Sequence, residues 1–171
     1  YREKPVSIGD IQLWKNAEET ADDKVKKNFF GKVFYNRESG KKHNPYDQEL
    51  RVVTSIENGD IELLKKSMQE DYEGEIGTLA KDALRHAKNL GVVILTLSSR
   101  AAIRGGVLPE IAYSLCDSYV LQIEDSRDVA SVIQLFRSAQ FEYAKMVEDI
   151  KGDGLETGGE TVNLQVVKCK A

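Results

Sequence analysis

Five polar side chains on the stretch 78–104 have the types and the spacing of a ligand-binding stripe. With 3.6 residues per helical turn, they would fall within about 80° of one another on one helix. The five are His86, Asn89, Thr96, Arg100 and Arg104. Because polar groups on a central helix must find partners or a ligand, this stripe is the candidate ligand-binding site. The alternative is that His86 and Arg100 only hold helices together through hydrogen bonds.

The sequence contains no recognisable pattern for catalysis or metal binding. It has two histidines, His43 and His86, and it lacks the HExxH, CxxC and GxSxG patterns. An ExxH pair, which would supply metal ligands from one helix, is also missing. The phosphate-loop pattern GxxxxGK[ST] is absent, and Gly105-Gly106 follows a helical pattern instead of a strand. We therefore predict a protein that is not an enzyme, with no catalytic residues, no metal site and no cofactor.

The stretch that carries the stripe predicts the central helix of the fold. Its middle, 89–97, is apolar on most sides, which is typical of a helix that lies inside a bundle. A membrane-spanning helix needs roughly 20 consecutive apolar residues. Asn89 and Thr96 interrupt the apolar run here, so it is too short to cross a bilayer. We predict a buried helix over 78–104, capped by Thr78 and ended by Gly105-Gly106.

The residues before the central helix predict a lead-in segment and a helical hairpin. A helix with a weak apolar face is expected from Ile11 to about Lys27, while the aromatic run 28–35 suggests a short strand or extended segment. Asn44-Pro45 predicts a helix start, with Asn44 as the cap and Pro45 as the first helical residue. Gly59 should end that helix in the left-handed conformation, and Asp60 should cap the next, 61–68.

Two more helices are expected after the central one. Pro109 should begin the first, whose apolar positions are Ala112, Cys116, Tyr119 and Ile123. The second, 128–150, has apolar residues at heptad a and d positions: Val129, Val132, Phe136, Ala139, Tyr143, Met146 and Ile150. This face either packs inside the bundle or forms a dimer seam.

Length and composition indicate one soluble domain, or one domain with pieces of its neighbours. Among 171 residues the net charge is −4 and the pI is near 5.3, which gives no electrostatic signature for nucleic acid. Cys116 and Cys169 lie far apart and resemble the reduced thiols of a cytosolic protein. We predict a mainly α fold, a bundle of about six helices. Its parts would be a lead-in (1–42), a helical domain (43–150), a flexible Gly-rich linker (151–160) and the start of a truncated further domain (161–171).

Several motifs, in order, resemble a known family. They are NRESGKKHNPYDQEL (36–50), SIENGD (55–60), EIGTLAKDALRHAKNL (75–90) and TLSSRAAIRGGVLPEIAYSLCDSYV (96–120). Together they are similar to the region preceding the DNA-binding domain in a group of AraC-type (AraC/XylS) transcriptional regulators. The segment 161–170 is similar to the opening of that domain's first helix.

The resemblance implies a cytoplasmic, bacterial transcription regulator that binds DNA through a C-terminal domain absent from this chain. It transfers no binding residues. The expected function is a regulatory or oligomerisation domain that forms a homodimer, so that two DNA-binding domains meet two half-sites. The alternative is a helical sensor that binds an unidentified small-molecule effector along the polar stripe.

Overall fold

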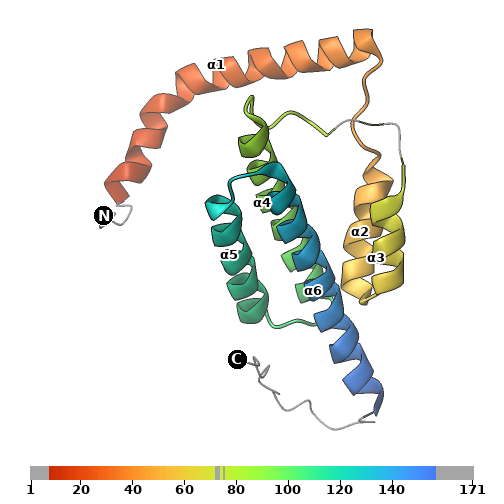
Figure 1. Ribbon diagram of the computed structural model, residues 1–171. Helices are drawn as coiled ribbons and strands as arrows, with labels where there is room; N and C mark the ends of the chain where they lie inside the picture. Colours follow the sequence, from red (N-terminus) through yellow and green to blue (C-terminus); the bar gives the residue numbers. More distant parts are fainter. Residues whose placement is uncertain (1–7, 72–73, 75, 157–171) are drawn as a thin grey trace. The chain divides into compact units, whose positions relative to one another are not determined.

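The computed structural model describes residues 8–71, 74 and 76–156, and in that part of the chain every regular element is an α-helix (Figure 1). The predicted mainly α fold of six helices is confirmed. The chain divides into two compact units, Tyr1–His43 and Asn44–Ala171. Each unit is described by itself below.

In its described residues, 8–43, the first unit contains one long helix, α1 (Ile8–Ser39). The helix continues through 28–35, so the prediction of a short strand or extended segment there is wrong. The apolar residues here have a helical spacing, since Val33 and Phe34 lie four residues after Phe29 and Phe30. The preference of aromatic residues for strands depends on their surroundings and does not decide the structure alone. Gly40, at φ 68°, follows the last helical residue in the left-handed conformation expected of a terminating glycine.

The second unit begins with the predicted hairpin of α2 (Tyr46–Asn58) and α3 (Ile61–Gln69). Gly59 has φ 70° and ends α2, and the Asp60 carboxylate accepts a hydrogen bond from the Leu63 N–H at 2.8 Å. The predicted start of α2 is wrong by one residue. Pro45 has an extended backbone and occupies the cap position itself, so Asn44 is not the cap.

The helix α4 (Ala83–Arg104) is shorter than predicted. Asp82, not Thr78, is its cap, and the Asp82 carboxylate accepts from the Arg85 N–H at 2.8 Å. Residues 76–80 have no regular structure, and they are held beside the first turns of α4 by side chains from that helix. The end of α4 at Gly105-Gly106 is confirmed, with Gly106 at φ 110°.

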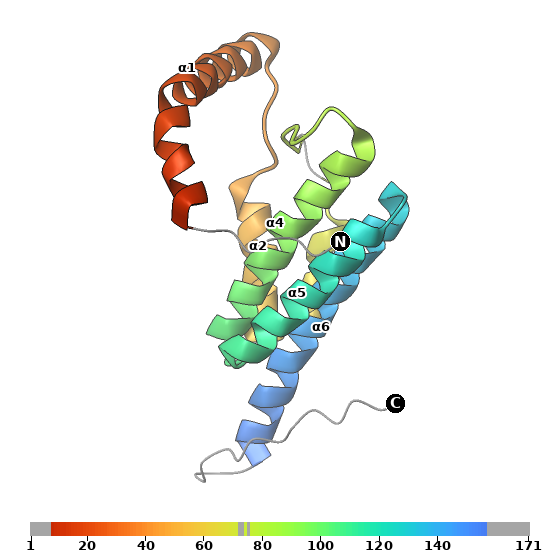
Figure 2. The same cartoon turned by 90° about the vertical axis from the view of Figure 1, so that its left-hand side faces the viewer.

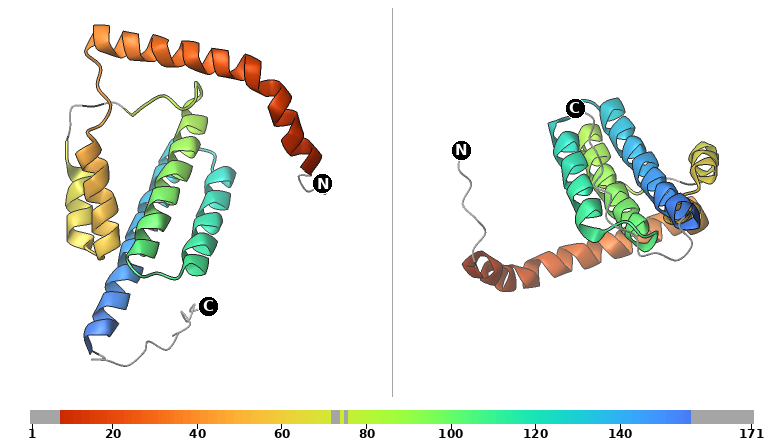
Figure 3. Two further views of the ribbon diagram at one scale, coloured as in Figure 1. Left: turned by 180° about the vertical axis from the view of Figure 1, so that it is seen from behind. Right: turned by 90° about the horizontal axis from the view of Figure 1, so that it is seen from below.

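Two helices share the centre of the second unit, α4 and α6 (Val129–Glu156). The helix α5 (Pro109–Asp125) packs against both of them on one side, and α2 packs against both on the other (Figures 1, 2 and 3). The predicted burial of α4 is incomplete, because the apolar residues Val93 and Leu97 are 48% and 36% exposed. Its neighbours in the unit cover α4 on three sides only.

The heptad face of α6 is buried inside the unit over its middle part. The buried residues of this face are Val132, Phe136, Ala139 and Tyr143, and Gln140 and Val147 beside them are also buried. Val129 and Ile150, at the two ends of the pattern, are exposed. Because α6 continues to Glu156, the prediction of a flexible linker is wrong for residues 151–156. Residues 157–171, which include the rest of that linker and the predicted further domain, lie outside the described part.

Candidate functional site

Two members of the predicted stripe hold the segment before α4. The Leu79 N–H donates a hydrogen bond to Nδ1 of His86 at 3.1 Å, and Nδ2 of Asn89 donates to the Leu79 carbonyl at 3.3 Å. His86 and Asn89 lie three residues apart on one face of α4, so they bind both polar groups of the same backbone residue. This pair fixes the chain that leads into the helix.

The other three members also contact the protein itself. Thr96 donates to the Val92 carbonyl of its own helix at 2.8 Å. The Arg100 guanidinium lies 4.4 Å from the centre of the Tyr113 ring, a cation–π contact between α4 and α5. Arg104 forms an ion pair with Glu57 of α2 at 2.8 Å. All five residues therefore lie on α4 as predicted, and their contacts favour the structural alternative over a shared ligand site.

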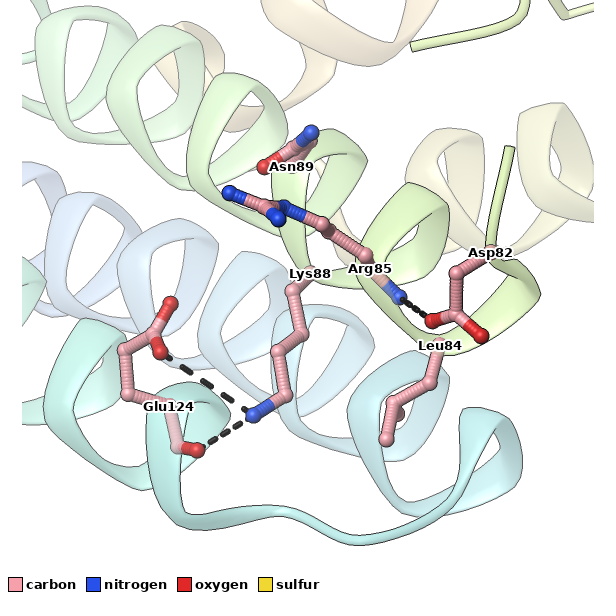
Figure 4. A pocket seen from close by; sticks show the side chains of 6 residues that line it. All are labelled: Asp82, Leu84, Arg85, Lys88, Asn89 and Glu124. Atoms are coloured by element: carbon pink, nitrogen blue, oxygen red, sulfur yellow. Dashed lines mark hydrogen bonds and ion pairs between the residues drawn. The ribbon is translucent and has the colours of Figure 1, made fainter. Parts of the chain in front are cut away.

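A cavity of about 340 Å³ opens where the start of α4 faces the end of α5 (Figure 4). It is lined by Asp82, Leu84, Arg85, Lys88, Asn89 and Glu124. Of the predicted stripe, Asn89 alone lines it. The sequence patterns did not indicate the other five lining residues. The one sequence signal for this region is Asp82, because aspartate is a better helix cap than the predicted Thr78.

The charges around this cavity are largely satisfied within the protein. The Asp82 carboxylate caps α4, and the Lys88 ammonium donates to the Glu124 carbonyl and lies 4.0 Å from the Glu124 carboxylate (Figure 4). Arg85 is the lining charge whose side chain has no partner among the described residues. Two cations and two carboxylates leave the lining with no net charge. The cavity is therefore a mixed polar surface with one free guanidinium.

Lys88→Ala is expected to lower the free energy of unfolding by about 1–2 kcal/mol. The Lys88 side chain is only 17% exposed, and its ammonium satisfies a carbonyl in the last turn of α5, an interaction that a methyl group cannot replace. Urea denaturation followed by circular dichroism measures the loss. The matched control is Arg85→Ala in the same cavity, expected to cost less than about 0.5 kcal/mol. Equal losses for the two variants would contradict the assigned role of Lys88.

A second group of polar side chains joins α5 to α6. The Tyr143 hydroxyl donates to the Ala112 carbonyl at 2.8 Å, and Tyr119 donates to the Glu142 carboxylate at 2.7 Å. Burial, and then the Glu142 hydrogen bond, raise the pKa of Tyr119 to about 12. Burial also raises the pKa of the Cys116 thiol, with Asp117 adding to the effect. These groups stay protonated near neutral pH, so the cluster holds helices together and does not supply a base or a thiolate nucleophile.

Neither a metal centre nor a membrane span emerges from the described residues. Over 8–71, 74 and 76–156, no group of three or more His, Cys, Asp or Glu side chains could hold a metal ion. Within the same ranges no helix is long and apolar enough to cross a membrane.

Comparison with known proteins adds no relative to these observations. No protein-family model, no curated protein and no solved structure matches the chain. The resemblance to AraC-type regulators therefore depends on the quoted motifs alone.

Proposed function

We propose that this chain is the regulatory and oligomerisation domain of an AraC-type transcription regulator, with DNA bound by a separate helix-turn-helix domain. The observation that carries the proposal is the order of motifs that resemble the family. In the structure two of these motifs lie at connections between helices of the second unit. SIENGD covers the last turn of α2 and the two residues that lead into α3, and RGGVLPE connects the end of α4 to the start of α5. The resemblance therefore includes residues at the ends of helices in the second unit.

The charge of the chain supports a role other than direct DNA binding. Phosphate contacts from Lys and Arg supply most of the non-specific affinity of a protein for duplex DNA. This chain carries a net charge of −4. A gel shift at low salt with the chain alone should show no specific complex, and specific sub-micromolar binding would contradict this part of the proposal.

The proposed role in oligomerisation predicts a homodimer. A regulator that reads two half-sites gains from two-fold symmetry, because each half-site then meets one copy of the DNA-binding domain. Most of the heptad face of α6 is already covered inside the second unit, so the dimer must use another surface. Light scattering at micromolar concentration should report twice the 19.1 kDa chain mass, or about 38 kDa. A monomer at high concentration would remove the oligomerisation role.

The second candidate function is a helical small-molecule sensor. One observation favours it, the free guanidinium of Arg85 beside Asn89 in an open cavity. A guanidinium is suited to a ligand with a carboxylate or phosphate group. In this case small carboxylates and phosphates screened by thermal shift should include one that raises the melting temperature, and Arg85→Ala should abolish that shift. A panel without effect on the wild-type chain would argue against the sensor.

A further inference from the structure

The five residues 76–80 have no regular structure and are attached to the second unit through one residue. Before them, the backbone at Gly74 lies against Asn44, where an added Cβ atom would be 2.7 Å from the Asn44 Cα. After them, the chain enters α4 at its cap, Asp82. Every hydrogen bond between 76–80 and another described residue ends on Leu79. These five residues are called the strap below.

The two bonds that hold the strap come from side chains one turn apart on α4. Nδ1 of His86 accepts from the Leu79 N–H at 3.1 Å, and Nδ2 of Asn89 donates to the Leu79 carbonyl at 3.3 Å. The side chains of Ile76 and Leu79 are 51% and 47% exposed, so the burial of apolar surface adds little to this attachment. Because both bonds hold the same residue, the loss of one weakens the other.

The bond to His86 depends on the charge of the imidazole. A neutral imidazole accepts a hydrogen bond at one ring nitrogen, whereas both nitrogens of an imidazolium are donors. Protonation of His86 therefore sets an N–H group against the Leu79 N–H. Histidine is the side chain that changes charge between pH 5 and 8. Since the released strap permits the proton and the attached strap opposes it, attachment is strongest above neutral pH and weakens as the pH falls.

The charged groups beside His86 on its own helix do not bond to the imidazole. Asp82, one turn earlier, uses its carboxylate to accept from the Arg85 N–H. Lys88, two residues after His86 and on the opposite side of α4, binds Glu124 of α5. His86 forms no ion pair with any described residue.

The helix α2 packs against the same side of α4 as His86. Arg104 follows His86 by 18 residues, or about five turns, and pairs with Glu57 of α2. The charged residues of α2 are Asp47, Glu49, Arg51 and Glu57. Neither these nor the described charged residues of α5 and α6 bond to His86. Among the described residues, the Leu79 N–H is therefore the side-chain partner that protonation of His86 removes.

We propose that residues 76–80 form a pH-sensitive strap, which His86 holds on the start of α4 at neutral pH and releases at mildly acidic pH. Release also breaks the bond between Asn89 and Leu79. Because Asn89 lines the cavity beside α4, acid frees its amide for contacts there (Figure 4). This switch lies within the second unit and does not depend on the proposed function.

Amide exchange measured by NMR tests the strap. The exchange rate of the Leu79 N–H is compared with that of an unstructured peptide at the same pH, so the intrinsic effect of pH cancels. We expect this protection to fall about five-fold between pH 7.5 and 5.5, as the loss of one ordinary hydrogen bond requires. The side-chain amide signals of Asn89 should shift over the same range. Unchanged protection of Leu79 would overturn the proposal.

Two substitutions of His86 separate its charge from its position. His86→Asn keeps an acceptor near the position of Nδ1 but takes up no proton, so Leu79 should stay protected at both pH values. His86→Leu removes the acceptor, so Leu79 should lose its protection at both. A pH response that persists in His86→Asn would overturn the proposal. Full protection of Leu79 in His86→Leu at pH 7.5 would overturn it as well.

Asp82→Asn is the matched control for the other titratable group at this end of α4. Asparagine caps a helix as well as aspartate does, so α4 should begin at the same residue and the pH response of Leu79 should remain. Loss of the response in this variant would overturn the role of His86, because Asp82 would then be the titrating group. Circular dichroism at both pH values should show that each variant keeps the helical content of wild type.

Discussion

Leu95→Asp is expected to unfold the second unit. Leu95 lies on the buried side of α4 and has no exposed surface. An aspartate there would be ionised without a partner or would have to bind a proton, and either choice costs several kcal/mol. A cost of that size is comparable to the whole stability of a typical domain. Circular dichroism should show loss of the cooperative thermal transition at neutral pH.

A control on the same helix separates burial from the effect of a charge as such. Leu97, two residues later, is 36% exposed, so Leu97→Asp should cost only about 1 kcal/mol. Leu95→Ala, which removes contacts without adding a charge, should fall between the two at about 2–5 kcal/mol. A cooperative melt of Leu95→Asp close to that of wild type would show that the core of the unit is wrongly placed.

The sequence predicts most helix ends correctly because the signals there are local. Gly59 and Gly106 adopt a positive φ, and Asp60 caps the helix that follows it. Pro109 starts α5, as expected, and the Asp128 carboxylate accepts a hydrogen bond from the Ser131 N–H in the first turn of α6. Each of these residues acts on its own backbone or on a backbone group three residues away. No knowledge of the rest of the fold is needed to predict them.

The errors arise where tertiary structure decides between two acceptable local choices. Thr78 and Asp82 are both good caps, and the structure uses Asp82, with residues 76–80 held beside α4 by His86 and Asn89. Lys151 and Gly152 follow Ile150 and were predicted to begin a flexible linker. In the structure they continue α6. A glycine inside a helix costs only about 1 kcal/mol relative to alanine, so Gly152 alone does not determine where α6 ends.

The candidate site shows the same limit. Helical geometry correctly places the five polar residues on one helix, but it does not tell how many neighbours that helix has. Because α2, α5 and α6 leave one side of α4 uncovered, Thr96, Arg100 and Arg104 are exposed. Their partners on other helices, such as Glu57 and Tyr113, follow from packing between segments far apart in the sequence.

Gly59→Ala is expected to destabilise the second unit by about 2–5 kcal/mol. Two costs add at this position. Gly59 has φ 70°, a left-handed conformation that costs an L-residue about 1–2 kcal/mol. A Cβ atom there would also lie 2.6 Å from the backbone nitrogen of Glu148 and 2.8 Å from its Cα. These atoms belong to the backbone of α6, so relief of the clash would require the hairpin of α2 and α3 to move away from α6.

Two further variants separate the strain from the clash. Gly106→Ala has the strain alone, because φ is 110° and the added Cβ would meet only a methyl group of Ile150 at an ordinary 3.5 Å. Gly59→Asn has the clash with less strain, because asparagine tolerates the left-handed conformation better than alanine. Denaturant unfolding should rank Gly59→Ala as the most destabilised and Gly59→Asn close behind it, with Gly106→Ala the least affected. If Gly59→Asn were as stable as wild type, the close approach of α6 to this turn would be wrong, and with it the packing that joins the hairpin to the centre of the unit.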